Sequence, residues 1–361
     1  MSRTLMIMAG GTGGHIYPAI SVAEYLRDKG WTIVWLGSRA GMEAHIVPPR
    51  GYTMAWIRFS GLRGKGLLRA AMLPFNLLIA CWQSASAIFI YRPDVVLGMG
   101  GYVAFPGGMM ASLLKRPLVI HEQNSVAGLT NRVLARLADK VCVAFPNAFK
   151  NNNLTLWVGN PVRADIGAIA TPATRYGARA TAGDCLQILV LGGSQGAAVL
   201  NATLPKTLAL IAETHRSQVT HQSGAAHIDA LRAAYAAAGV AAETLPFIDD
   251  MATRYAKADV VICRAGASTI AEIAAAGVAS VLVPLPSAVD DHQTNNARFL
   301  SERGAAVLIP QAEFTPEKLA QLLQGFARDK LLVMAQAARA AAKPDATQAV
   351  AQVCMELAHA A

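Results

Sequence analysis

Short apolar runs alternate along the chain with segments in which apolar side chains recur every three or four residues. Leu5–Ala9 is such a run, and the residues from Ile16 to Leu26 then carry apolar side chains at helical spacing. The run Leu186–Leu191 opens a similar unit about half a chain later. This alternation is typical of parallel sheets with helices on both faces. It predicts an α/β protein built from two similar halves.

The same reasoning predicts further elements in both halves. Strands are expected at Thr32–Leu36, Asp94–Leu97, Pro117–Ile120, Lys140–Ala144, Asp259–Cys263 and Ala279–Val283, and helices at Ala267–Ala276 and from Asp345 to about Ala358. Pro18 is expected in the first turn of the first helix. Gly and Pro in Val158–Arg163 predict a hinge, and the composition up to Gly183 predicts a linker.

The length of 361 residues fits two domains. We predict an N-terminal domain over residues 1–163 and a C-terminal domain over residues 164–340. The final helix, within residues 341–361, is expected to pack back on the first domain.

Charge and cysteine usage narrow the class of protein. The net charge of +9 suggests an anionic partner, but the cations are spread thinly and lack the interleaved aromatic residues of a nucleic-acid binder. The five cysteines are distant from one another, which favours a reducing cytosol over a disulfide framework or a zinc site. The chain has no run of about 20 uninterrupted apolar residues, so we expect no membrane-spanning helix.

Two glycine-rich loops follow predicted strands and precede predicted helices. They are Gly10–His15 and Gly192–Gly196. Each fits either a tight turn or a phosphate site at a helix N-terminus, and their recurrence in matching places favours nucleotide or phosphate binding. Neither loop has the spacing of a dinucleotide fingerprint or of a P-loop.

Polar residues also follow the predicted strands, where ligands of α/β sheets bind. They are His15, Asn124, Ser194, Arg264 and, one or two turns further on, Glu272. From spacing alone, Glu272 fits a solvated helix residue better than a ligand contact, and Arg163 fits a surface charge better. The pairs Asp249-Asp250 and Asp290-Asp291 are expected to cap helices.

A series of short motifs resembles the MurG family of glycosyltransferases, in order and with compatible spacing from residue 6 to about residue 300. The motifs are Gly10–His15 with Tyr17-Pro18, Ser60–Gly66, Gly98–Tyr102, His121–Asn124, Gly159–Arg163, Gly192–Ala197, Phe247–Met251, Arg264–Thr269 and Asp290–Thr294. The resemblance implies the GT-B fold, in which two Rossmann-like domains with parallel sheets face each other across a cleft.

The resemblance also implies the donor, UDP-GlcNAc, and its site. Contacts are expected at Thr12, Gly13, Gly14, Asn124, Arg163, Ser194, Ile248, Arg264, Ala267, Ser268, Thr269, Ile270, Ala271, Glu272 and Gln293. The backbone of Ile248 would meet the uracil, Glu272 the ribose hydroxyls and Gln293 the GlcNAc hydroxyls. Arg163 would neutralise the departing UDP.

The implied reaction is an inverting transfer of GlcNAc to the 4-hydroxyl of a lipid-linked muramyl-pentapeptide (lipid I), giving lipid II for peptidoglycan synthesis. His15 is the candidate general base, although it also fits a phosphate ligand or a loop cap. The chain has no Asp-x-Asp motif, and helix dipoles with arginines could stabilise the leaving group, so we expect neither metal nor cofactor.

A basic and apolar segment suits the second substrate. No acidic residue lies between Glu43 and Asp94, and apolar side chains are dense at residues 67–82. This fits either a core helix or a helix on an anionic membrane, and the implied lipid acceptor favours the membrane. We expect Arg63, Lys65, Arg69, Phe75 and Trp82 to meet the acceptor or membrane, with the protein peripheral on the cytoplasmic face of the inner membrane.

Three other functions remain open from the residues: another GT-B enzyme such as a UDP-GlcNAc 2-epimerase, a nucleotide-dependent oxidoreductase, and a non-enzymatic nucleic-acid binder. The missing fingerprint disfavours the oxidoreductase, and only the high pI suggests the nucleic-acid binder. The apolar, acid-free segment favours the transferase over the epimerase, which needs no lipid acceptor.

Overall fold

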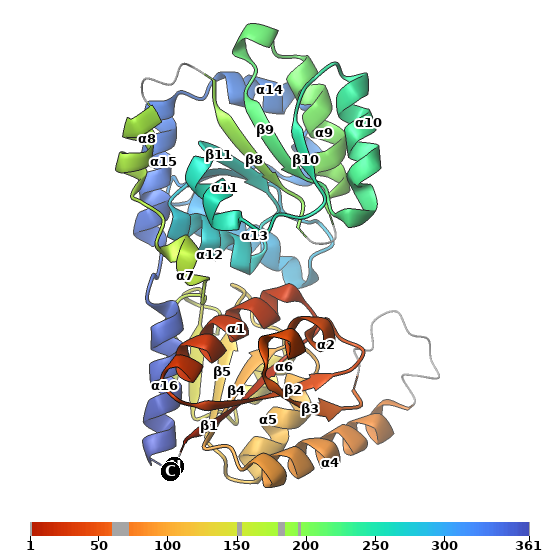
Figure 1. The fold of residues 1–361 in the computed structure, drawn as a ribbon, viewed down its shortest axis with the longest axis vertical. Coiled ribbons are helices and arrows are strands. Elements are labelled where there is room, and N and C mark those ends of the chain that lie inside the picture. The colour runs from red at the N-terminus through yellow and green to blue at the C-terminus, as the bar shows by residue number, and fades with distance from the viewer. Residues whose placement is uncertain (1, 60–71, 150–153, 180–184, 194–195, 361) are drawn as a thin grey trace. The chain divides into compact units, whose positions relative to one another are not determined.

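A computed structural model of the chain describes residues 2–59, 72–149, 154–179, 185–193 and 196–360, and all strand pairs within them are parallel (Figure 1). The chain divides into two compact units, Met1–Arg163 with Lys343–Ala361 and Ala164–Ala342. Each unit holds one sheet, and the predicted α/β class is confirmed.

The first unit has the strand order β3-β2-β1-β4-β5-β6-β7 in its described residues. Its elements are β1 (Thr4–Ala9), α1 (Gly13–Asp28), β2 (Thr32–Ser38), α2 (Glu43–Ile46), η1 (Pro48–Arg50), β3 (Thr53–Ile57), α4 (Leu73–Tyr91), β4 (Val95–Gly100), α5 (Ala104–Leu113), β5 (Leu118–Glu122), α6 (Leu129–Leu134), β6 (Lys140–Val143), β7 (Thr155–Trp157) and α16 (Ala346–Ala360).

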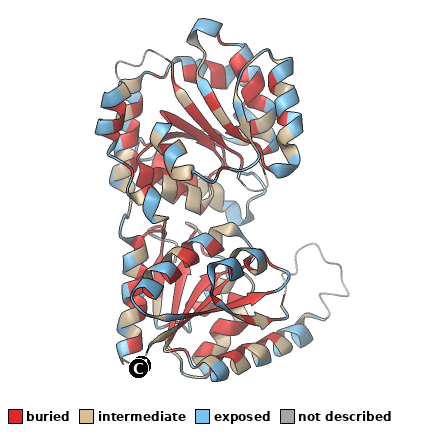
Figure 2. Cartoon of the chain, in the orientation of Figure 1, coloured by how far each residue is buried: buried red, intermediate tan, exposed pale blue. Residues whose placement is uncertain are grey.

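Two apolar layers enclose this sheet, whose strands are largely buried (Figure 2). Leu5 and Ile7 of β1 face the layer that α1 and α16 cover, whereas Met6 and Met8 face the layer that includes α4 and α5. Alternate residues of one strand therefore serve opposite faces, as the pleat requires. The last helix packs on α1, and Val350 and Cys354 lie in the same cluster as Leu5 and Ile7.

The second unit has the order β10-β9-β8-β11-β12-β13 in the part that is described. Its elements are α7 (Ala164–Gly167), α8 (Pro172–Arg179), β8 (Gln187–Leu191), α9 (Ala198–Ala209), η2 (Glu213–His215), β9 (Gln218–Gln222), η3 (Ala225–His227), α10 (Ile228–Ala237), β10 (Glu243–Leu245), α11 (Met251–Lys257), β11 (Val260–Cys263), α12 (Ala267–Ala276), β12 (Ala279–Leu282), η4 (Val289–Asp291), α13 (His292–Ser301), β13 (Ala306–Leu308), η5 (Gln311–Glu313), α14 (Pro316–Gln324) and α15 (Arg328–Ala341).

The predicted linker after the hinge is wrong for its larger part, because it contains α7 and α8. Arg175 of α8 is buried and donates to the carbonyl oxygens of Tyr255 (3.2 Å) and Ala276 (2.8 Å). These carbonyls belong to the C-terminal turns of α11 and α12, where a cation is favourable. These tertiary contacts hold α8 against the second unit.

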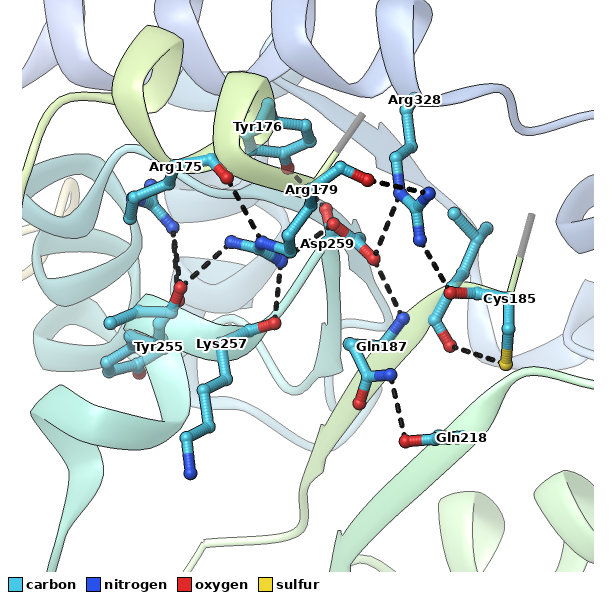
Figure 3. Close-up of polar contacts among 12 residues, drawn as sticks. Arg175, Tyr176, Arg179, Cys185, Gln187, Gln218, Tyr255, Lys257, Asp259 and Arg328 are labelled. Atoms are coloured by element: carbon cyan, nitrogen blue, oxygen red, sulfur yellow. Dashed lines mark hydrogen bonds and ion pairs between the residues drawn. The ribbon is translucent and has the colours of Figure 1, made fainter. Parts of the chain in front are cut away.

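Figure 3 shows that α8 also contributes to a buried ionic cluster around Asp259. The Asp259 carboxylate is fully buried and accepts from Arg179 Nη1 (2.7 Å) and from the backbone N–H of Gln187 (2.8 Å). Arg328 Nε lies 3.8 Å from the same carboxylate. The cluster joins α8, β8 and α15 at the amino end of β11.

Two smaller predictions are also wrong. Pro18 lies beyond the first turn of α1, because the helix already begins at Gly13. Asp250 and Asp291 do precede helices, but neither side chain caps its helix. The Asp250 carboxylate pairs with Arg254, and Asp291 Oδ1 accepts from Thr294 Oγ1 (2.6 Å).

Helix α4 is long, apolar and largely exposed. Among the described residues it is the one helix long and apolar enough to cross a membrane, judged by length and composition alone. That no helix of this chain spans a membrane stays a prediction, because α4 meets the criterion by length and composition alone. Asn76, Gln83 and Ser84 interrupt its apolar run without adding charge. Only 22% of its most apolar window is buried, so α4 is not an ordinary core helix.

Candidate functional site

Each sheet reverses its strand order at one point, and most of the predicted site residues lie near these points. The order reverses between β1 and β4 in the first unit and between β8 and β11 in the second. Loops that leave the carboxyl ends of such strands diverge to opposite faces of the sheet, which opens a crevice for ligands.

In the first unit, the glycine-rich loop passes directly into α1. Thr12 is the N-cap residue, and its carbonyl oxygen accepts from the backbone N–H of His15 (3.1 Å) and of Ile16 (3.3 Å). Gly13 and Gly14 form the first helical turn together with His15. The predicted residues Thr12, Gly13, Gly14 and His15 thus lie at a helix N-terminus, where backbone N–H groups favour anions.

The end of β4 lies close against this loop, and only glycine allows that approach. A Cβ atom on Gly101 would lie 2.2 Å from the Gly10 carbonyl oxygen. A Cβ atom on Gly100 would lie 3.1 Å from two atoms of the His15 ring. The φ angles are also positive, 96° at Gly100 and 82° at Gly101. Both the lack of space and the backbone conformation therefore disfavour any side chain at these positions.

Glu43 also holds this glycine-rich loop in place. The sequence predicted no role for it. Its fully buried carboxylate accepts from the backbone N–H groups of Gly11 (3.1 Å) and Ser38 (3.0 Å). Burial, reinforced by the Glu43 charge, raises the pKa of the neighbouring Tyr102. The only sequence signal was that Glu43 is the last acid before the acid-free segment.

His15 is hydrogen-bonded to the carboxyl end of β5. Its Nδ1 lies 3.0 Å from Gln123 Oε1, and Gln123 Nε2 lies 2.7 Å from the Met99 carbonyl oxygen and 3.2 Å from His121 Nδ1. His121 Nε2 lies 2.9 Å from the Gly159 carbonyl oxygen. Complete burial lowers the pKa of His121 to about 4, so this imidazole is neutral at neutral pH.

The loop that carries Asn124 is organised by a second buried carboxylate. Glu122 Oε1 accepts from the Asn124 backbone N–H (2.9 Å), and Glu122 Oε2 accepts from Gly128 N–H (3.1 Å) and Asn131 Nδ2 (2.9 Å). Glu122 and Asn131 had no predicted role. Together they fix the backbone on both sides of Asn124.

In the second unit, α12 directs its N-terminus at the corresponding crevice. Gly266 is its N-cap residue, and Ala267, Ser268 and Thr269 form the first turn, followed by Ile270 and Ala271. Ser268 Oγ is buried without a hydrogen-bond partner in the described chain. A buried hydroxyl of this kind is costly unless a ligand completes it.

Gln293 and Asn296 of α13 hold the loop before α12. Gln293 Oε1 accepts from the backbone N–H groups of Leu285 (3.0 Å) and Ala265 (3.3 Å). Asn296 Nδ2 donates to the Ala265 carbonyl oxygen (3.1 Å). With its oxygen so engaged, Gln293 is oriented by the protein itself.

Glu272 also has a structural partner. The hydroxyl of Tyr255, a fully buried residue of α11, donates to Glu272 Oε2 at 3.0 Å. This bond fixes the carboxylate on α12, and no pattern in the sequence indicated it. Ile248 is buried in the loop between β10 and α11.

Arg264 and Arg163 are placed differently from the other predicted residues, and four further predicted residues lie outside the described part of the chain. Arg264 Nη1 donates to the carbonyl oxygens of Val283 and Pro284 (both 3.1 Å) and its Nη2 to Gln311 Oε1 (2.7 Å), so its donors bind the protein itself. Its contact with a nucleotide stays a prediction. Arg163 is partly exposed and is the last residue of the Met1–Arg163 part of the first unit. Ser194, Arg63, Lys65 and Arg69 lie outside the described residues.

Comparisons with known proteins agree with this arrangement. Residues 5–143 match the glycosyltransferase family 28 N-terminal domain, and residues 187–353 match the family 28 C-terminal domain. A protein of Aromatoleum aromaticum is 62% identical over 356 residues, covering 99% of this chain and 98% of that protein. One of Dechloromonas aromatica is 58% identical over 358 residues, covering 99% of this chain and all of that protein.

Both relatives are named UDP-N-acetylglucosamine–N-acetylmuramyl-(pentapeptide) pyrophosphoryl-undecaprenol N-acetylglucosamine transferase. The crystal structure of Acinetobacter baumannii MurG is similar with a TM-score of 0.84 and 42% identity, covering 98% of this chain and 99% of that one. The similarity extends through both units. The chain therefore belongs to the MurG family of glycosyltransferases.

Proposed function

We propose that this protein transfers GlcNAc from UDP-GlcNAc to the 4-hydroxyl of undecaprenyl-pyrophosphoryl-MurNAc-pentapeptide, lipid I, and so forms lipid II. The observation that carries the proposal is the full-length relation to transferases of that name. The helix N-termini at both switch points support it, because a sugar diphosphate needs such anion sites.

The second unit binds the donor in this proposal. The N-terminus of α12 faces the diphosphate, and Ser268 Oγ, buried and unpartnered in the described residues, donates to a phosphate oxygen. The Glu272 carboxylate, oriented by Tyr255, accepts from the ribose hydroxyls. Gln293 donates to a GlcNAc hydroxyl, and the backbone of Ile248 meets the uracil. Ser194, Thr269 and Arg264 complete the donor site.

The first unit supplies the acceptor side and the base. His15 accepts the proton of the muramyl 4-hydroxyl while that oxygen bonds to the anomeric carbon. The bond from the anomeric carbon to UDP breaks, and UDP leaves with the electron pair on the opposite face, which inverts the configuration to a β-1,4 link. Thr12, Gly13, Gly14, Asn124 and Arg163 stabilise the charge that develops on the diphosphate.

The exposed side of α4 is the membrane-binding surface in this proposal. Phe75, Leu78, Trp82 and Phe89 recur at helical spacing and are each at least 60% exposed. The opposite side, with Ala80, Ser84 and Ile88, is buried against the first unit, and Gln83 Oε1 accepts from the Arg58 backbone N–H. A helix anchored along one side suits the interface of a bilayer rather than its interior.

Exposed cations accompany this stripe. Arg58 and Arg92 are both exposed. Arg58 lies shortly before residues 60–71, which the structure does not describe, and Arg92 directly follows α4. Basic groups beside an apolar helix favour an anionic lipid surface. We therefore place the enzyme as a peripheral protein on the cytoplasmic face of the inner membrane, where Arg63, Lys65 and Arg69 would meet the acceptor pyrophosphate.

The reaction itself distinguishes this function from that of a UDP-GlcNAc 2-epimerase. We expect labelled UDP-GlcNAc to release UDP only when a lipid-linked muramyl acceptor is added, with the label moving to the lipid. UDP release and free ManNAc without any acceptor would instead identify an epimerase. Thin-layer separation of the products measures both outcomes.

Glu272→Ala is expected to weaken UDP-GlcNAc binding by roughly 10- to 100-fold, because hydrogen bonds to a charged group contribute about 1.5–3 kcal/mol. The effect on kcat should be smaller, since ribose contacts act in ground and transition states alike. Calorimetric titration with UDP-GlcNAc measures the affinity. Tyr255→Phe should show a weaker loss, and Glu302→Ala, an exposed acid of the same unit, none. Unchanged affinity in Glu272→Ala would exclude the ribose contact.

His15→Ala is expected to lower kcat by roughly 10²–10⁴ with little change in donor affinity, as the loss of a general base should. Steady-state kinetics with both substrates, together with a donor titration, separate the two effects. His45→Ala is the matched control, because His45 is an exposed histidine of the same unit. Turnover close to that of the unmodified enzyme would remove His15 from the chemistry.

The double variant Phe75→Ser/Trp82→Ser is expected to bind anionic phosphatidylglycerol vesicles at least about tenfold more weakly, since burying one such side chain contributes about 1.5–3 kcal/mol. Vesicle cosedimentation measures the binding, and added salt should weaken it further. Val333→Ser, which removes a 65% exposed apolar residue from α15 of the second unit, is the control. Equal vesicle binding by the double variant and the unmodified protein would contradict the assignment of this surface.

A further inference from the structure

Four groups form a continuous row of hydrogen bonds from His15 into the interior of the first unit, which we name the His15–Gly159 relay. It runs from His15 Nδ1 to Gln123 Oε1 (3.0 Å), from Gln123 Nε2 to His121 Nδ1 (3.2 Å), and from His121 Nε2 to the Gly159 carbonyl oxygen (2.9 Å). Gln123 and His121 are 1% and 0% exposed, so water does not compete for these bonds.

The inner end of the relay fixes the direction of the bonds. The Gly159 carbonyl oxygen can only accept, so His121 Nε2 carries a proton and donates it. Burial keeps the pKa of His121 near 4, so the ring carries no second proton at neutral pH. His121 Nδ1 therefore presents a lone pair and accepts from the side-chain amide of Gln123.

A second carbonyl fixes Gln123 independently. Gln123 Nε2 donates to the Met99 carbonyl oxygen at 2.7 Å, and a flipped amide would place two oxygens against each other there. The two N–H bonds of the amide are thus used on Met99 and His121. The amide oxygen is left to face His15, and it can only accept.

We propose that Gln123, held by Met99 and His121, is a positioning residue that keeps His15 as the Nδ1–H tautomer with its lone pair on Nε2. The inference rests on the proposed role of His15 as the base. In that role Nε2 receives the proton of the acceptor hydroxyl, and Nδ1–H stays bonded to Gln123 throughout.

The packing around the ring supports a fixed orientation. A Cβ atom on Gly100 would lie 3.1 Å from His15 Cε1 and Nδ1 and 3.6 Å from Gln123 Oε1. The backbone at Gly100 therefore lies against the edge of the ring that bonds to Gln123. That contact closes the Nδ1 side of the ring.

The test measures the tautomer directly in the full-length protein labelled with ¹⁵N-histidine, since ring nitrogens with and without hydrogen give different ¹⁵N signals. His15→Ala assigns the His15 signals by their loss. We expect His15 in the Nδ1–H form and His121 in the Nε2–H form. Gln123→Met, which keeps the side-chain size but has no acceptor, should shift His15 toward the Nε2–H form.

Kinetics of the same variants provide the second readout. Gln123→Met should lower kcat by about tenfold, less than the full loss of a base, with KM for both substrates nearly unchanged. Gln123→Glu also loses both amide donors but keeps an acceptor, so it should retain the Nδ1–H form of His15. A merely structural role of Gln123 predicts the same tautomer change in both variants. Gln83→Met, which removes a different amide hydrogen bond of this unit, should leave His15 unchanged.

Two results would contradict the positioning role of Gln123: an Nε2–H form of His15 in the unmodified protein, or an unaltered His15 tautomer in Gln123→Met. Either would do so even if His15→Ala abolishes turnover. Full turnover in His15→Ala would instead overturn the role of His15 as base, while the tautomer measurement still reports on the relay. The two failures are therefore distinguishable.

Discussion

Close backbone approach between the loops at the carboxyl ends of central neighbouring strands is the constraint on which the candidate site in each unit depends. In the first unit, the end of β4 lies against the loop after β1, where a Cβ atom on Gly101 would meet the Gly10 carbonyl oxygen at 2.2 Å. In the second, a Cβ atom on Gly196 would meet the Ser223 carbonyl oxygen at 2.3 Å. Glycines at these places leave helix N-termini uncovered, which is what a diphosphate requires.

Loops with so little side-chain packing need other restraints, and buried polar groups provide them. Glu43 and Glu122 each accept two or more hydrogen bonds from loop N–H groups, and Gln293 does the same with its amide oxygen. Bonds to buried carboxylates are strong because the surroundings are poorly polarisable. The residues expected to touch substrate are therefore held before it binds, which lowers the ordering cost of catalysis.

Helix α4 shows how one element serves stability and function with different sides. Its buried side packs on the sheet and α5, while its exposed side presents large apolar residues that a water-soluble surface would not keep. Because both the buried and the exposed side of α4 are apolar, its composition resembles that of a membrane-spanning helix. In the proposed function, anchoring along one side would keep this helix at the membrane interface.

The sequence by itself determined the two glycine-rich loops, the helices α1, α12 and α16 and the strands β1, β2, β4, β5, β6, β8, β11 and β12, because these depend on local periodicity and on backbone freedom. The bounds of α12, Ala267–Ala276, agree fully with the prediction. Only the tertiary structure decided which polar atoms meet. His15 and Gln123 are 108 residues apart, and Arg175 closes helix ends about 80 and 101 residues away. Such pairs depend on how remote elements pack against one another, which no local pattern in a single sequence encodes.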